Sequence, residues 1–247
     1  MRDVLVLCYH GLSETWPSQL AVAPATLEEQ VARLLARGYR PATFREAVLA
    51  PPAPRTLAVT FDDACRSVYE LALPVLRSLG VPGCVYAPTD WIGRTEPMRW
   101  AGIEEWHGGP HERELLPMSW EQLGELAEEG WEVGSHTCTH PHLTQLDDPQ
   151  LADELRASRD ECEARLGRAC DTIAYPYGDV DGRVVAATAA AGYAAAGSIA
   201  SKRPPAPLDW PRVGIWRADA RWRAELKTAP LVRRLRAREQ LPARSSG

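Results

Sequence analysis

The chain has 247 residues, of which 45% are hydrophobic, and a formal net charge of -5 at pH 7. These values are typical of a soluble globular protein that is long enough for one large α/β domain. The negative charge gives no electrostatic reason to expect nucleic acid as a partner, and no apolar run approaches the roughly eighteen residues of a membrane span.

The first residues, MRDVLVLCYHGL, contain an apolar run that is too short for a secretory signal peptide, and we expect them to form the first strand. The six cysteines include no CxxC pair and no dense framework, so we expect reduced thiols. Both observations favour a cytoplasmic protein, with an export route or a misassigned start codon as the alternative.

Short segments typical of β-strands alternate with helical patterns along the chain. Strands are predicted at residues 3–10, 56–61, 83–88, 131–136, 171–178, 193–199 and 212–217. Helices are predicted at residues 26–39, 66–80, 119–130, 148–167 and 182–193. In the fourth helix, Asp148 is expected to cap the start and Gly167 the end. Such alternation indicates a parallel sheet, either open or closed as a barrel.

No repeat or low-complexity linker divides the chain, so a single domain is predicted over residues 1–230. The basic segment 231–247 is predicted to be a frayed tail. Residues 92–118 contain no clear element, and a loop of that length in a compact domain is usually functional or mobile.

The segment TLAVTFDDAC, residues 56–65, runs from a predicted strand directly into two adjacent carboxylates, Asp62 and Asp63. Because successive strand side chains point to opposite faces, these two should diverge at the carboxyl end of the strand, where α/β folds place their sites. One carboxylate is then available to bind a cation while the other stays free. The alternative is a plain strand end followed by a helix cap.

Two histidines four positions apart, His136 and His140, follow the strand predicted at 131–136. Imidazoles at this spacing reach one metal from a helical turn or a tight loop. Together with one aspartate they supply three protein ligands and leave other metal positions open, which is the arrangement of a hydrolytic zinc site. His142 lies outside this spacing, and we expect it at the surface or beside the ligands.

A tight turn is predicted within IAYPYGDVD, residues 173–181, because Pro176 and Gly178 both favour turns. Such a turn can aim backbone N–H groups into a site. A plain loop fits the same residues.

Taken together, TFDDA, SHTCTH followed by PHL, and YPYG resemble, in order and spacing, the motifs of the polysaccharide deacetylase family, the NodB-homology carbohydrate esterases. The resemblance implies an α/β fold, a deformed (β/α) barrel of about seven strands that forms the catalytic domain. It also implies a hydrolase with one divalent metal ion, most often Zn²⁺, with Co²⁺, Ni²⁺ or Mn²⁺ as alternatives. Members of this family remove acetyl groups from N-acetylated or O-acetylated sugars.

The resemblance further implies roles for individual residues. Asp63 corresponds to the metal-binding carboxylate, and His136 and His140 complete the set of ligands. Asp62 corresponds to the general base. Tyr177 would lend its backbone N–H to the oxyanion.

The chain departs from the family pattern at three places. Ala64 stands where the first motif normally ends in glycine. Many members have an arginine at the position of Ala174, and Arg212 is a candidate substitute for orienting the base. No histidine follows His142, so the downstream histidine that protonates the leaving amine is missing. His10 resembles the acid of circularly permuted members, and a histidine that only caps the first strand is the alternative.

Contacts with the sugar are predicted from residue type and position. Trp91, after YAPTD, and Trp100 or Trp106 in the long loop are candidates for stacking on a pyranose, with a core or loop-anchoring role as the alternative. Pro176 and Arg212 are further candidates for substrate contact.

The predicted activity is metal-dependent N-deacetylation of an acetylated carbohydrate, which is a polysaccharide, a glycolipid or a small glycoside. One alternative is the same site acting on O-acetyl esters or on non-carbohydrate amides. The other is a carbohydrate-binding protein without activity, against which the intact pair of carboxylates weighs. The sequence predicts no particular oligomeric state.

Overall fold

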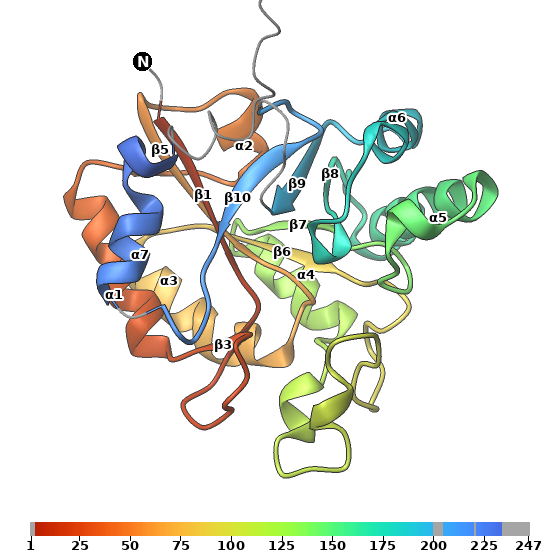
Figure 1. Cartoon of the computed structure of the whole chain (residues 1–247), viewed down its shortest axis with the longest axis horizontal. Coiled ribbons are helices and arrows are strands. Elements are labelled where there is room, and N and C mark those ends of the chain that lie inside the picture. The colour runs from red at the N-terminus through yellow and green to blue at the C-terminus, as the bar shows by residue number, and fades with distance from the viewer. Residues whose placement is uncertain (1–2, 200–204, 220, 234–247) are drawn as a thin grey trace, which may run out of the picture.

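Seven parallel strands close into a barrel at the centre of the molecule (Figure 1). The computed structural model describes residues 3–199, 205–219 and 221–233. Around the barrel the strands follow in the order β1 (Asp3–Tyr9), β10 (Trp210–Gly214), β9 (Ala195–Ile199), β8 (Thr172–Ala174), β7 (Glu132–Ser135), β6 (Gly83–Ala87) and β5 (Arg55–Phe61). The barrel closes because β5 also pairs with β1, from Asp3 opposite Arg55 to Tyr9 opposite Phe61. The predicted (β/α) barrel of about seven strands is confirmed.

Short strands add to this barrel. The start of β5 pairs with β4 (Arg40–Pro41). A separate two-stranded sheet joins β2 (Gly11–Leu12) to β3 (Ala21–Val22).

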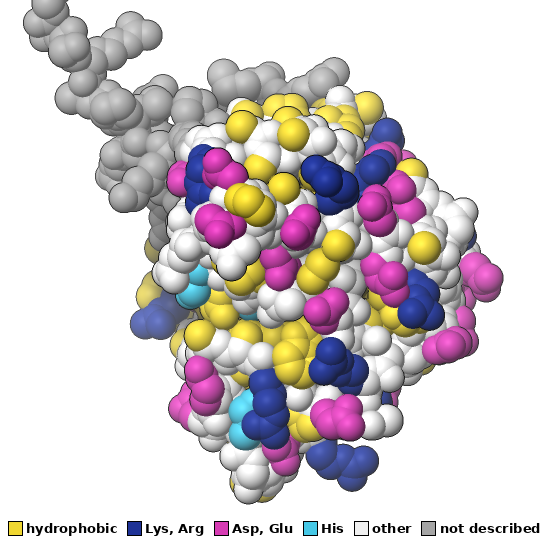
Figure 2. All heavy atoms as spheres, turned by 90° about the vertical axis from the view of Figure 1, so that its right-hand side faces the viewer, with side chains coloured by type: hydrophobic (Ala, Val, Ile, Leu, Met, Phe, Trp, Pro, Cys, Tyr) yellow, Lys and Arg dark blue, Asp and Glu magenta, His cyan; other side chains and the backbone are white. Residues whose placement is uncertain are grey.

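Helices pack around the outside of the barrel, with α1, α3 and α7 on one side and α5 and α6 on the other (Figure 1). Their bounds are α1 Pro24–Ala36, α2 Phe44–Leu49, α3 Leu73–Leu79, α4 Trp120–Glu128, α5 Asp148–Leu166, α6 Gly182–Ala190 and α7 Arg221–Thr228. A π-helical turn, Val68–Ala72, precedes α3, and 3₁₀ turns lie at Glu104–Trp106, Glu112–Leu115, Leu143–Gln145 and Pro176–Gly178. Acidic and basic side chains are interspersed on the face that carries α5 and α6 (Figure 2).

The structure corrects the sequence prediction at several elements. Of the strand predicted at 171–178, only Thr172–Ala174 is a strand, because Pro176 lacks the N–H that a sheet ladder needs. Helices α2 and α7 were not predicted. The capping box at the start of α2, in which the side chains of Thr43 and Glu46 each accept a backbone N–H, was an available signal.

The cap of α5 is one residue earlier than predicted. Asp147, not Asp148, is the N-cap, and its carboxylate accepts a hydrogen bond from the Gln150 N–H at 2.9 Å. Asp148 is already the first helical residue. Gly167 ends the helix in the left-handed conformation with φ 65°, as predicted.

The strands bury both faces, and their alternation decides which side chains point into the barrel. In β5, Leu57 and Val59 join the outer core with residues of α1 and α3, whereas Ala58 joins the inner core with Tyr86. Burying one such aliphatic side chain stabilises the fold by about 1.5–3 kcal/mol. Because side chains alternate along a strand, Asp62 falls on the same inward face as Ala58.

Residues 231–233, which the sequence prediction assigned to the tail, are joined to the domain through Arg233. They are helical, and Arg233 donates a hydrogen bond to the Val4 carbonyl at 3.0 Å. Residues 234–247 of the predicted tail lie outside the described residues. Within the described ranges, no helix is both long and apolar enough to cross a membrane.

Candidate active site

Asp62 and Asp63 directly follow β5 and point to different partners, as predicted. Asp62 is 2% exposed and Asp63 4% exposed. Asp62 continues the inward face of the strand and meets Arg212. Asp63 leaves the strand conformation with φ 69°, and its carboxylate turns toward His136 and His140.

The three predicted metal ligands converge. The Nε2 atoms of His136 and His140 each lie 3.4 Å from the Asp63 Oδ1. The Nδ1 of His136 lies 2.8 Å from the carbonyl oxygen of Ala174, which can only accept, so Nδ1 carries the proton. The Nε2 of His136 is therefore unprotonated in the neutral ring and available to a metal.

This group of ligands fits a divalent cation. Ligand atoms about 2.0–2.2 Å from a shared tetrahedral ion lie roughly 3.3–3.6 Å apart, close to the spacing found here. The Asp63 Oδ1 is buried and has no hydrogen-bond partner, an arrangement that costs free energy unless a cation compensates it. Two imidazoles and one carboxylate form a donor set suited to Zn²⁺ and also to Co²⁺ or Ni²⁺.

The pKa shifts of the same three residues bear on metal binding. Burial tends to raise the pKa of Asp63, but its contacts with the two histidines hold that pKa well below the usual range. Burial lowers the pKa of His140 overall, despite Asp63, and so favours the neutral ring that coordinates a metal. For His136, burial would lower the pKa, but Asp63 and Asp62 raise it overall.

Five non-glycine residues have positive φ angles among the described residues, and all of them lie in this site. They are Asp63 (69°), Ala64 (48°), Thr137 (68°), His140 (66°) and Tyr177 (59°). Each such residue costs on the order of 1–3 kcal/mol and persists only where its surroundings enforce it. Ala64 thus adopts the left-handed conformation that would favour the glycine of the family pattern.

The loop between the two histidines is held by Glu154, a residue that sequence reasoning missed. Its Oε2 accepts hydrogen bonds from the backbone N–H groups of Cys138 at 2.8 Å and Thr139 at 3.0 Å. Its Oε1 accepts a bond from the Thr139 hydroxyl at 2.6 Å. Glu154 lies on α5, and the sequence contains no signal that would direct its side chain to this loop.

Arg212 is the partner of Asp62. Its Nη1 donates to Oδ1 at 2.6 Å and its Nη2 donates to Oδ2 at 2.7 Å. Burial would raise the pKa of Asp62, but the Arg212 guanidinium charge, the nearby His136 and the hydrogen bonds from Arg212 together lower the pKa to about 2. The Arg212 side chain is fully buried, which favours the base-orienting alternative over direct substrate contact.

Gly197 on β9 makes room for this arginine. A Cβ atom at position 197 would lie 2.6 Å from the Arg212 Nε. Gly197 lies in register between Ala174 on β8 and Trp210 on β10. The arginine on β10 can therefore reach inward across a strand position that has no side chain.

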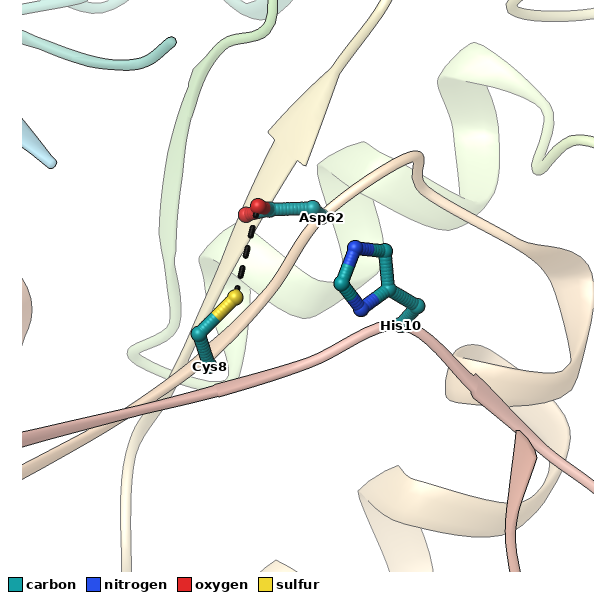
Figure 3. A group of neighbouring side chains, drawn as sticks. All are labelled: Cys8, His10 and Asp62. Atoms are coloured by element: carbon teal, nitrogen blue, oxygen red, sulfur yellow. Dashed lines mark hydrogen bonds between the residues drawn. The ribbon is translucent and has the colours of Figure 1, made fainter. Parts of the chain in front are cut away.

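His10 lies beside the same carboxylate, at the end of β1 (Figure 3). His10, Cys8 and Asp62 each offer one side-chain atom within 4.8 Å of the others, and the Cys8 thiol donates to the Asp62 Oδ2 at 3.4 Å. The His10 ring stacks on Trp216, with centroids 5.2 Å apart. His10 is buried, and its Nδ1 has no hydrogen-bond partner among the described residues.

The predicted turn at YPYG lies next to the metal ligands. Tyr177, with φ 59°, places its ring edge-on to His140 at 4.6 Å between centroids and stacks on His142 at 3.9 Å. Burial raises the pKa of the Tyr177 phenol to about 12, so it stays protonated at neutral pH. Pro176 is buried and forms part of the turn.

The tryptophans predicted to stack on sugar differ in their surroundings. One face of Trp100 is covered by His140, with ring centroids 4.2 Å apart and an interplanar angle of 23°. Trp91 packs on Trp100 in a T-shaped contact and carries the Arg94 guanidinium over its ring. Trp106 packs against Trp16.

The family model and the relatives that match this chain are all described as deacetylases. A family model described as Polysaccharide deacetylase matches residues 50–196. YxkH of Bacillus subtilis (strain 168), which is named as a member of that family, is 26% identical over 193 residues, covering 76% of this chain and 61% of YxkH. A chitooligosaccharide deacetylase of Bradyrhizobium sp. (strain ANU 289) is 32% identical over 116 residues, covering 45% of this chain and 49% of that protein. The chain thus spans less than two thirds of either relative.

A solved structure shares the fold. The crystal structure of a polysaccharide deacetylase from Bacillus cereus superposes with a TM-score of 0.75 at 24% sequence identity. The superposition covers 92% of this chain and 69% of that chain.

Proposed function

The chain belongs to the polysaccharide deacetylase family, and we propose on that basis that it is a metal-dependent hydrolase that removes acetyl groups from an N-acetylated sugar. The observation that carries this proposal is the convergence of Asp63, His136 and His140 beside a second, ionised carboxylate, Asp62. A binding protein has no need of that second carboxylate. An N-deacetylase needs it as a base.

Asp63, His136 and His140 would hold one divalent ion, with Zn²⁺ as the first choice for two imidazoles and a carboxylate. When bound, such an ion acts as a Lewis acid and lowers the pKa of a coordinated water to about 7. The rest of the chemistry falls to side chains and backbone groups of this chain.

Asp62 would accept the proton of the attacking water. A general base has to be ionised before it acts, and Arg212, helped by His136, lowers the pKa of Asp62 to about 2, so that the carboxylate is ionised at neutral pH. The two parallel hydrogen bonds also fix the orientation of the carboxylate. General base catalysis of this kind contributes about 10²–10⁴ in rate.

Two further groups would complete the reaction. The backbone N–H of Tyr177 would donate to the developing oxyanion, and one such donor is typically worth about 10²–10³ in kcat. His10 would give its proton to the departing amine. This role is consistent with its burial beside Asp62 and with its stacking on Trp216, which holds the ring in place.

Metal analysis combined with an acetate-release assay tests the proposal. The purified protein should contain about one divalent ion per chain and release acetate from N-acetylglucosamine oligosaccharides. Asp63→Ala should lose metal and activity together, whereas Asp62→Asn should keep the metal and lose turnover by about 10²–10⁴. An Asp62→Asn protein that turns over like the wild type would refute the assignment of the base. Bound metal without turnover on any acetylated sugar, ester or amide would instead indicate a binding protein.

A further inference from the structure

We infer that Trp100 is a positioning residue that holds the His140 imidazole in the orientation required for metal binding. The inference rests on the proposed function, because it concerns the metal site of that reaction. It gives a role to the loop of residues 92–118, which lies outside the barrel strands and outside the family motifs.

The two histidine ligands are held in different ways. Metal-binding histidines usually donate their other ring N–H to a carbonyl, carboxylate or water, and this bond fixes the ring orientation. His136 follows that rule, since its Nδ1 lies 2.8 Å from the Ala174 carbonyl. The Nδ1 of His140 is buried and has no hydrogen-bond partner among the described residues. The contacts that the described residues make with this ring are of another kind.

Aromatic rings supply these contacts. The Trp100 indole stacks on the His140 ring with centroids 4.2 Å apart and an interplanar angle of 23°. Tyr177 meets the same ring edge-on at 4.6 Å. A stack prevents the imidazole from tilting and an edge contact limits its rotation, so the two rings together restrict its orientation.

Trp100 is itself held firmly enough to act as a support. The carbonyl of the next residue, Ala101, accepts a hydrogen bond from the Tyr177 hydroxyl at 3.0 Å. Met98 is fully buried, and its N–H donates to the Leu115 carbonyl at 3.0 Å. The loop therefore has an anchor on each side of Trp100.

The stack also limits how Trp100 could serve as a sugar platform. Such a platform needs one free ring face, and the His140 stack occupies one of the two faces of Trp100. Trp91, which is partly buried and packs on Trp100 in a T-shaped contact, has no such stack on a metal ligand among the described residues.

Metal affinity tests the inference without reference to activity. Metal-free wild type, Trp100→Ala, Trp100→Phe and Trp106→Ala proteins would be titrated with Zn²⁺ in competition with a chelating dye. Removing the indole should raise the Zn²⁺ Kd about 10-fold or more, as for other supports of metal ligands, and phenylalanine should recover most of the loss. Trp106→Ala is the matched control, because it removes a tryptophan of the same loop that packs on Trp16 and His111, not on a metal ligand.

A second measurement separates positioning from loss of structure. The visible absorption spectrum of the Co²⁺-loaded protein should change in Trp100→Ala and not in Trp106→Ala, while the melting temperatures of the two metal-free variants report on folding. The inference is overturned if Trp100→Ala binds Zn²⁺ as tightly as the wild type, or if both variants lose affinity to the same extent. Failure of the wild type to bind any metal would instead overturn the proposed function.

Discussion

Arg212 clasps Asp62 through two parallel hydrogen bonds of 2.6 and 2.7 Å, although the two residues are 150 positions apart in the chain. The pair fits the expectation that Arg212 substitutes for the arginine that the family resemblance implies at the position of Ala174. Here that arginine comes from β10 instead of β8, and the intervening Gly197 on β9 gives it space. The guanidinium keeps the carboxylate ionised in a fully buried setting.

Replacing Arg212 by Met should lower the stability of the protein, because it leaves the buried Asp62 carboxylate unpaired. Asp62 would keep its buried position without a cation, so the free energy of unfolding should fall by about 3–5 kcal/mol. Without the guanidinium charge, burial would raise the pKa of Asp62, and the acid limb of kcat/KM should move to higher pH. Urea unfolding and a pH–rate profile check both effects. Arg212→Lys, which keeps the charge and loses the paired hydrogen bonds, should be intermediate. An unchanged acid limb in the Met variant would contradict this account.

Gly197→Ala should impair the pairing of Arg212 with Asp62, although neither of these two residues is substituted. The added methyl would lie 2.6 Å from the Arg212 Nε, so the arginine or the strand has to move. Overpacking of this kind costs about 1–3 kcal/mol, and we expect kcat to fall with it. Gly124→Ala in the middle of α4 is the control, because its new methyl meets no atom within 4 Å apart from its chain neighbours and the backbone of its own helix. The control should stabilise the protein by roughly 0.5–1 kcal/mol in thermal or urea unfolding. Equal destabilisation in both variants would argue against the steric explanation.

His10→Ala should discriminate between leaving groups. An amine must be protonated as it departs, so deacetylation of an N-acetyl sugar should slow by about 10²–10⁴. The aryloxide of an activated aryl acetate can leave without being protonated, so hydrolysis of that ester should change little. Parallel assays on the two substrates give the answer. The same loss on both would identify His10 as a structural residue.

Glu154→Ala should weaken metal binding without removing a ligand. Its carboxylate accepts three hydrogen bonds from the backbone and side chain of residues 138–139, between His136 and His140. Loss of such supporting bonds typically costs about 10–100-fold in metal affinity. Dye competition with Zn²⁺ measures the change. Asp160→Ala, at an exposed position on the same helix, should bind Zn²⁺ like the wild type. Wild-type affinity in Glu154→Ala would mean that the loop holds its shape unaided.

Some features of the site are local in the chain, and the sequence is sufficient to predict them. Strand alternation predicts that Asp62 and Asp63 diverge, and the spacing of His136 and His140 predicts that they pair. The parallel barrel follows from the alternation of strands and helices, and from the resemblance of three short motifs. Each of these predictions depends on patterns and motifs that are local in the chain.

Other features depend on contacts between distant segments, and only the tertiary structure decides them. The reach of Arg212 to Asp62 requires the strand order β10–β9–β8 and a glycine at one register position. The stack of Trp100 on His140 requires the path of a long loop that has no periodic pattern to predict it. Local periodicity determines which face of an element is buried, but barrel closure and loop packing determine which of those faces meet.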